Sequence, residues 1–124
     1  MSPRPRILIV EDEVAVATGL QWLLEAEGMT VHVVGLAAEV LAALDDFKPE
    51  VMLLDLSLPD ANGREVYAWV KGRVPVIFST GSFDELERME RIGTAKVEIL
   101  MKPFTLEELL RSINRVLPPR ASSE

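Results

Sequence analysis

The chain has 124 residues and a net charge of −7, from 13 basic and 20 acidic side chains. This length fits one domain, and the absence of cysteine excludes disulfides, thiolate metal sites and cysteine nucleophiles. No apolar run approaches the roughly 20 residues that span a bilayer, and no basic patch offers a nucleic-acid surface. We therefore expect a cytoplasmic protein without membrane contact or direct nucleic-acid binding.

Short apolar runs alternate with helical patterns along the chain. Residues 7–10 form a β-rich run without polar alternation, as in strands that are buried on both faces. The first half continues with a helix from Val14 to a stop at Gly28, a strand at Thr30–Val34, a helix at 37–46 and a strand at 51–54. The second half predicts a helix at 64–70, a strand at 75–79, a helix at about 83–92, a strand at 97–101 and a helix at 105–117.

Five strands that alternate with five helices predict a doubly wound α/β domain. Its five-stranded parallel sheet would have the order 2-1-3-4-5 and would be flanked by the five helices, with right-handed crossovers. Residues 5–117 are expected to form this domain, and residues 118–124 a C-terminal tail or the stub of a linker.

Polar residues stand directly after four of the five predicted strands. Glu11 and Asp12 follow the first strand, Asp55 the third, Thr80 the end of the fourth and Lys102 the fifth. With the order 2-1-3-4-5, the carboxyl ends of these four strands are neighbours, and ligands bind in the crevice beyond such strand ends. These side chains should therefore converge on one shallow site.

Three crowded carboxylates repel one another and call for a cation. Oxygen ligands without histidine or cysteine favour Mg²⁺, which readily bridges to phosphate. Lys102 and Thr80 could complement a phosphoryl group in transfer, and one carboxylate could be the nucleophile. Taken singly, each residue also has a plain reading: the acids as helix caps, Asp55 and Thr80 as turn residues, Lys102 as a solvated lysine.

Four stretches of the chain resemble response-regulator receiver domains of two-component systems. They are residues 7–13, residues 53–63 with the pattern Asp55-x-x-x-Pro59-x-x-x-Gly63, residues 75–81, and Lys102-Pro103-Phe104. The resemblance covers about residues 5–117 in order. It implies the flavodoxin-like fold of chemotaxis-regulator-like receivers and a role in phosphorelay signal transduction.

The resemblance also implies a phosphorylation site. Asp55 matches the phospho-acceptor, which receives its phosphoryl group from a sensor histidine kinase or phosphotransfer protein and becomes an aspartyl phosphate. Glu11 and Asp12 match the acidic pair that holds Mg²⁺ with Asp55, and Ser57 matches the position whose backbone carbonyl completes the metal shell. Such a domain is not a conventional enzyme, but it catalyses its own phosphorylation and dephosphorylation.

Two further positions match the switch of the family. Thr80 matches the hydroxyl that moves toward the phosphoryl group, and Lys102 matches the invariant amine, whose bond to Pro103 is usually cis. Phosphorylation is expected to remodel the face formed by helix 4, strand 5 and helix 5, through which such domains also form homodimers. Ile99 stands where receivers usually have an aromatic residue, so the usual coupling to Thr80 is in doubt; residues 92–98 also depart from the pattern.

Three alternatives stand beside this interpretation. A phosphatase of the haloacid dehalogenase type would call for a second aspartate two residues after the nucleophile, where Ser57 stands. A nucleotide-binding module would call for a glycine-rich loop after the first strand, where Glu11 and Asp12 stand. A docking domain that no longer takes phosphate, a pseudo-receiver, stays open.

Overall fold

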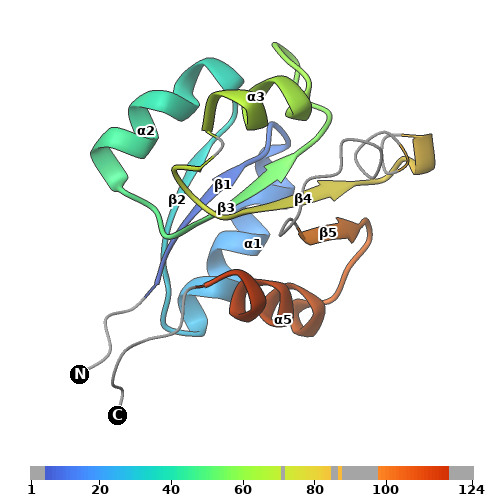
Figure 1. Ribbon diagram of the computed structural model, residues 1–124. Coiled ribbons are helices and arrows are strands. Elements are labelled where there is room, and N and C mark those ends of the chain that lie inside the picture. Colours follow the sequence, from blue (N-terminus) through green and yellow to red (C-terminus); the bar gives the residue numbers. More distant parts are fainter. Residues whose placement is uncertain (1–4, 71, 85–86, 88–97, 118–124) are drawn as a thin grey trace.

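The computed structural model describes residues 5–70, 72–84, 87 and 98–117. Its five parallel strands are β1 (Arg6–Val10), β2 (Thr30–Val34), β3 (Val51–Asp55), β4 (Val76–Thr80) and β5 (Glu98–Met101). The sheet order is β2-β1-β3-β4-β5 (Figure 1). The predicted doubly wound sheet and its strand order are therefore confirmed.

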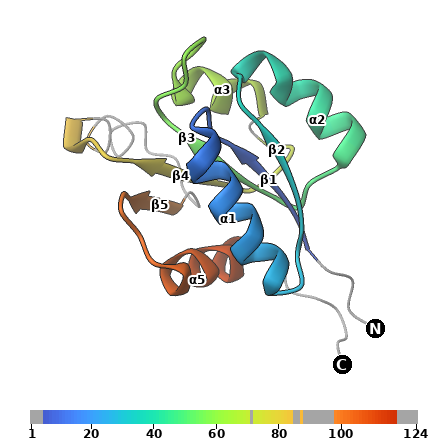
Figure 2. The same cartoon turned by 180° about the vertical axis from the view of Figure 1, so that it is seen from behind.

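Helices cover both faces of the sheet. They are α1 (Val14–Ala26), the short 3-10 helix η1 (Ala37–Glu39), α2 (Val40–Phe47), α3 (Gly63–Val70) and α5 (Leu106–Val116). In Figures 1 and 2, α1 and α5 lie on one face, and α2 and α3 on the other. The predicted helix at 83–92 lies largely outside the described residues, as does the segment 118–124. No helix among the described residues is long and apolar enough to cross a membrane.

The core consists of two apolar clusters, one on each side of the sheet. Because side chains alternate along a strand, Leu8 and Val10 pack toward α2 and α3, whereas Ile7 and Ile9 pack toward α1 and α5. The central strands β3 and β4 are buried along their whole length. This buried frame holds the carboxyl ends of the strands in fixed positions, and those ends carry the polar residues singled out from the sequence.

The last helix begins as the sequence predicts. The Thr105 hydroxyl accepts a hydrogen bond from the Glu108 amide at 3.0 Å, and the Glu108 carboxylate accepts one from the Thr105 amide at 2.8 Å. This reciprocal pair satisfies two backbone donors at the start of α5. Leu109 and Ile113 then bury the inner face of the helix against the sheet.

Candidate functional site

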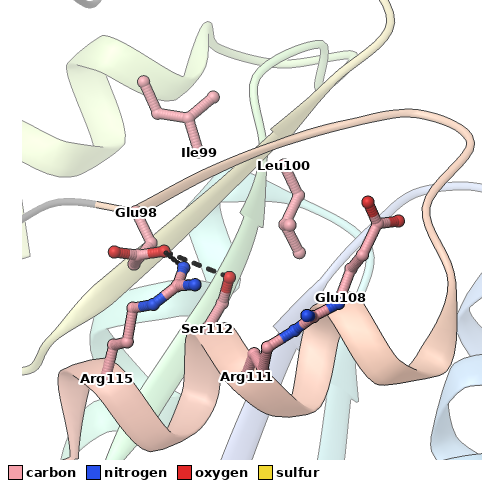
Figure 3. A pocket seen from close by; sticks show the side chains of 7 residues that line it. All are labelled: Glu98, Ile99, Leu100, Glu108, Arg111, Ser112 and Arg115. Carbon is pink, nitrogen blue, oxygen red and sulfur yellow. Dashed lines mark hydrogen bonds and ion pairs between the residues drawn. The ribbon is translucent and has the colours of Figure 1, made fainter.

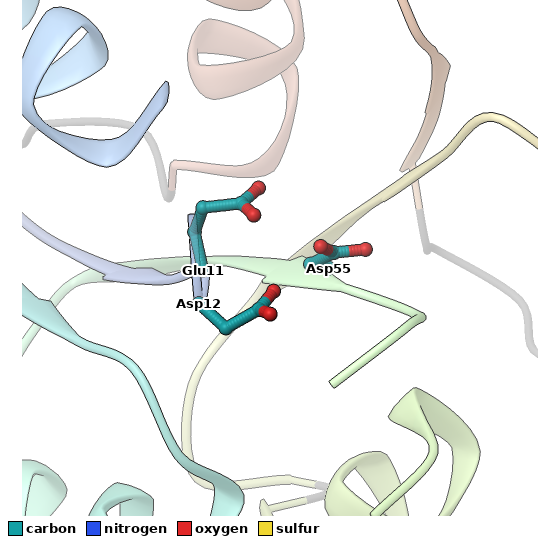
Figure 4. A group of neighbouring side chains, drawn as sticks. All are labelled: Glu11, Asp12 and Asp55. Carbon is teal, nitrogen blue, oxygen red and sulfur yellow. The ribbon is translucent and has the colours of Figure 1, made fainter. Parts of the chain in front are cut away.

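Three carboxylates meet at the carboxyl edge of the sheet (Figure 4). Glu11 and Asp12 directly follow β1, and Asp55 is the last residue of β3. Each of the three offers a carboxylate oxygen, and these oxygens lie within 4.8 Å of one another. Glu11 and Asp55 are each only 4% exposed, whereas Asp12 is open to solvent. The expected convergence of the acidic residues is therefore observed.

Lys102 is the cation that faces two of these carboxylates. Its Nζ lies 3.1 Å from Glu11 Oε1 and 3.3 Å from Asp55 Oδ2. The Lys102 amide donates to the Thr80 carbonyl at 2.8 Å, which continues the pairing of β4 with β5 past Met101. The bond between Lys102 and Pro103 is cis, as the resemblance implied.

Burial and charge act in opposite directions on these groups. Burial raises the pKa of Glu11 above its ordinary value, and the Asp55 carboxylate raises it further; the Glu13 amide and Lys102 oppose this shift. Burial alone would lower the pKa of Lys102, but Asp55 and Glu11 outweigh it and the pKa of the amine is raised. The three carboxylates thus carry more negative charge than the Lys102 amine neutralises.

The donor set fits a hard divalent cation. All three groups offer carboxylate oxygen, the ligand type that Mg²⁺ prefers, and exposed Asp12 leaves room for the waters that Mg²⁺ keeps. The two buried carboxylates are already oriented by their own chain. Asp55 Oδ1 accepts from the Ser57 amide at 2.9 Å, and Glu11 Oε2 accepts from the Glu13 amide at 3.2 Å. An acidic triad of this kind could hold a metal ion.

Ser57 and Thr80 take different places around the cluster. Ser57 begins the exposed loop after β3 and forms an isolated bridge with Asn62, which closes that loop. Thr80 lies inside β4, one residue further than the sequence predicted, and it is 1% exposed. Its hydroxyl accepts a hydrogen bond from the Ser82 amide at 3.0 Å. Asp55 pairs with Ser79 in the sheet, so Thr80 lies one residue beyond the end of β3.

The structure explains why the Asp55-x-x-x-Pro59-x-x-x-Gly63 pattern ends in glycine. A Cβ built at this position would lie 2.8 Å from the Cα of Leu56 and would also overlap its Cδ2. Leu56 follows Asp55 directly, and its carbonyl accepts a hydrogen bond from the Gly63 amide at 3.1 Å. Glycine therefore lets the start of α3 return close to Leu56, next to Asp55, where any larger residue would push Leu56 away.

Sequence reasoning missed that the loop after β2 lies beside the acidic residues of the site. That strand offers no polar side chain at its end, yet a Cβ built on Gly35 would lie 3.7 Å from the Glu11 carbonyl and 3.9 Å from the Asp12 Cα. Asp60 reaches the same loop from the other side and accepts hydrogen bonds from the Ala37 and Ala38 amides. Asp60 stands in a turn-rich stretch where an aspartate reads as a turn residue, so no local signal marks this contact.

The face formed by β5 and α5 carries its own polar network (Figure 3). Glu98 Oε1 accepts from Ser112 Oγ at 3.2 Å and from an Arg115 guanidinium nitrogen at 2.9 Å. These residues line a shallow pocket of about 190 Å³. Ile99 points to the opposite side of the strand and packs at the edge of the cluster under α2 and α3. Residues 92–97, which differ from the family pattern in sequence, lie outside the described residues.

An apolar groove of about 440 Å³ lies beside the acidic cluster. Val16 and Leu20 of α1 line it together with Pro103 and Phe104, and Glu11, Ser79 and Lys102 complete its wall. The exposed side of α1 is also apolar: Val14 is 77% and Trp22 is 69% exposed, and the helix has no charged residue before Glu25. Exposed apolar side chains that gather on one helix are typical of a surface that a partner covers.

Comparison with known proteins agrees with this geometry. Residues 7–114 match the family described as the response regulator receiver domain. The chain therefore belongs to the receiver domains of two-component response regulators, a class whose members interact with histidine kinases.

Particular relatives are similar over most of the chain. The DNA-binding response regulator MtrA of Mycobacterium tuberculosis is 31% identical over 112 residues, which cover 89% of this chain and 49% of that protein. The sensory transduction protein RegX3 of Mycolicibacterium smegmatis is 33% identical over 120 residues, which cover 95% and 53%. The chain thus spans about half the length of these curated relatives.

Among solved structures, a CheY-like response regulator receiver domain protein from Methanospirillum hungatei is similar in fold and sequence. It superposes with a TM-score of 0.77 at 29% identity, and the match covers 90% of this chain and 91% of that one. The similarity therefore extends over nearly the whole receiver fold.

Proposed function

We propose that this chain is a magnesium-dependent phosphorylation switch that takes a phosphoryl group onto Asp55. One observation carries the proposal: Asp55 lies at a strand end between two further carboxylates and a lysine, with Lys102 Nζ 3.3 Å from Asp55 Oδ2. Glu11, Asp12 and Asp55 would hold Mg²⁺ with the Ser57 carbonyl. When bound, the metal would neutralise the carboxylates and the charge on the transferring phosphoryl oxygens.

The chain's own residues would act as follows. An Asp55 carboxylate oxygen attacks the phosphorus of a donor's phosphohistidine; the new P–O bond forms as the P–N bond breaks, and the imidazole nitrogen keeps the electron pair. Lys102 remains beside the acceptor as a fixed positive charge against the phosphoryl oxygens. Thr80 donates its hydroxyl to the same group once it leaves its contact with the Ser82 amide. Water attacking the phosphorus would break the P–O bond to Asp55, restore the carboxylate as the leaving group and release inorganic phosphate.

The phosphoryl donor would be a sensor histidine kinase or phosphotransfer protein in the cytoplasm. The groove of Val16, Leu20 and Phe104 opens beside Lys102, so a protein that covers it would present its histidine near Asp55. We further propose that residues 5–117 act as one receiver unit, with 118–124 as a tail or linker stub. Its output would be a changed surface around β5 and α5, through which two phosphorylated copies would associate.

Intact mass after incubation with acetyl phosphate tests the switch chemistry. We expect one phosphoryl adduct that requires Mg²⁺ and is absent from an Asp55→Asn variant. Asp45→Asn serves as the matched control, because Asp45 is an exposed carboxylate that pairs with Arg73 and lies on α2, away from the acidic cluster. If wild-type protein forms no adduct and also fails to bind beryllofluoride with Mg²⁺, the phosphorylation switch is wrong and a docking domain becomes the better interpretation.

A further inference from the structure

Two carboxylates satisfy four consecutive backbone amides at the start of η1. Glu39 Oε1 accepts from the amides of Gly35 and Leu36, both at 3.1 Å. Asp60 Oδ1 accepts from the Ala37 amide at 2.8 Å, and Asp60 Oδ2 accepts from the Ala38 amide at 3.0 Å. Helix starts leave such amides without partners in the backbone, so side chains normally supply them. Glu39 is a local cap, whereas Asp60 comes from a different loop more than 20 residues away.

The loop that Asp60 holds also touches the acidic residues of the site. The Glu11 amide donates to the Val34 carbonyl at 3.0 Å, and a Cβ built on Gly35 would lie at ordinary van der Waals distance, 3.9 Å, from the Asp12 Cα. The loop after β2 is therefore packed against the backbone that carries Asp12.

Asp60 itself belongs to the loop after β3, which starts at Ser57. That loop is closed at its base by the Ser57–Asn62 bridge and by the return of Gly63 onto Leu56. Its middle part, where Asp60 stands, meets the start of η1 through the two hydrogen bonds of the carboxylate. Asp60 thus connects the Ser57 side of the candidate metal site to the Asp12 side.

We propose that Asp60 is a positioning residue for the metal site: its two hydrogen bonds to the start of η1 hold the Asp12 and Ser57 loops at the separation that Mg²⁺ requires. This inference rests on the proposed function. Mg²⁺ demands nearly ideal octahedral geometry, so a loop free to shift by a fraction of an ångström weakens metal binding before it affects the acceptor itself. Residues that orient metal ligands typically change metal affinity by about 10- to 100-fold when they are replaced.

The carboxylate is suited to this task in a way that an amide is not. Both of its oxygens accept, whereas Asn offers one accepting oxygen and an NH₂ group that cannot accept from a backbone amide. The hydrogen bond from Ala37 keeps the pKa of Asp60 below its ordinary value, so the group is ionised at neutral pH. Asp60→Asn should therefore retain part of the connection and Asp60→Ala none of it.

The test is direct Mg²⁺ binding by calorimetry on the full chain, together with the Mg²⁺ concentration that gives half the maximal rate of labelling by acetyl phosphate. For Asp60→Ala we expect Mg²⁺ affinity to fall by about tenfold or more, with Asp60→Asn in between. At saturating Mg²⁺ the labelling rate of both variants should return to within about twofold of wild type. A purely destabilising effect would not produce this separation between metal affinity and maximal rate.

Glu39→Ala is the matched control. It frees two amides of the same loop but leaves the connection from Asp60 intact, so its Mg²⁺ affinity should stay near the wild-type value. The inference is overturned if Asp60→Ala binds Mg²⁺ like wild type, or if Glu39→Ala weakens binding as much as Asp60→Ala does. Circular dichroism establishes that each variant is folded, and Asp60→Asn keeps the test decisive if Asp60→Ala is not. If wild-type protein itself neither binds Mg²⁺ nor takes phosphate, the proposed function has failed; if wild type does both, the result reports on Asp60 alone.

Discussion

At the scale of single residues, hydrogen bonds from backbone amides orient the important carboxylates. Asp55 is held by the Ser57 amide, Glu11 by the Glu13 amide and Asp60 by the amides of Ala37 and Ala38. Such bonds to an ionised acceptor are short and strong relative to neutral ones. For buried Glu11 they do not cancel the cost of burial, whereas for exposed Asp60 they lower the pKa. The same kind of contact therefore has opposite net outcomes in the two environments.

The lowered pKa of Asp60 predicts a pH-dependent contribution to stability. A carboxyl whose pKa is lower in the folded than in the unfolded state stabilises the fold above the unfolded-state value, here about 3.8, and loses that contribution as pH falls through the folded-state pKa. We expect the difference in unfolding free energy between wild type and Asp60→Asn to be constant from pH 7 to about pH 5 and to shrink below pH 3.8. Urea unfolding at a series of pH values measures it. A difference that grows as the solution becomes more acidic would contradict the assignment.

At the scale of elements, α1 differs from α5, the other helix on the same face of the sheet. It buries Ala17 and Leu24 against the strands but also leaves Val14, Trp22 and Leu23 exposed. Exposed Val16 and partly buried Leu20 border the groove that opens beside Lys102. α5, by contrast, is strongly amphipathic in sequence, with Leu109 and Ile113 inside and charged residues such as Arg115 outside. The surface of α1 before Glu25 carries no charge and lies near Asp55, which suits the proposed contact with a donor protein.

Val16→Arg tests that role of α1. It places a charge in the apolar groove, so phosphoryl transfer from a phosphohistidine donor protein that labels wild type should slow by about tenfold or more, as for a buried interface anchor. Labelling by acetyl phosphate, which needs no protein contact, should stay within about twofold. Leu41→Arg is the control, because Leu41 is a similarly exposed apolar residue of α2, on the other face of the sheet. Equal slowing by both variants, or by neither, would remove α1 from the donor contact.

At the scale of the whole molecule, the acidic site costs stability that a cation would restore. The chain carries a net charge of −7, and two nearly buried carboxylates share the single amine of Lys102. Removing one carboxylate leaves a one-to-one pair rather than an orphan charge, which is the more favourable arrangement in a buried site. The fold tolerates the repulsion between these carboxylates, since the two apolar clusters on either side of the sheet hold the strand ends in place.

The repulsion between the two carboxylates predicts that the Asp55→Asn variant is more stable than wild type when no metal is bound. Without Mg²⁺, Asp55→Asn should unfold with a free energy on the order of 1 kcal/mol higher and a Tm higher by about 4 °C. Mg²⁺ at ten times its dissociation constant should stabilise wild type by about 1.4 kcal/mol, and it should have a smaller effect on the variant. Thermal melts with and without a chelator measure both effects. A lower Tm for the metal-free variant would show that Asp55 contributes more through its pairing with Lys102 than it costs through repulsion.

Much of the fold and of the candidate site follows from the sequence because the controlling signals are local. Buried parallel strands are short apolar runs, and a polar residue that ends such a run, such as Asp55 or Lys102, must lie at the carboxyl edge of the sheet. The capping box of Thr105 and Glu108 at the start of α5 is likewise a pattern over four residues. The predicted strand at 75–79 ends one residue too early: β4 includes Thr80, because pairing with Met101 extends the ladder by one residue.

By itself, the sequence determined that the candidate site residues share one edge of a five-stranded sheet, because strand periodicity and the polar residues that end each strand are local patterns of consecutive residues. Only the tertiary structure decided that Lys102 faces both Glu11 and Asp55, that Gly35 lies against the backbone of Asp12, and that Asp60 reaches the start of η1. These contacts join loops that are distant in the chain. Their partners are chosen by how the helices and strands pack, and no pattern within either loop encodes that choice.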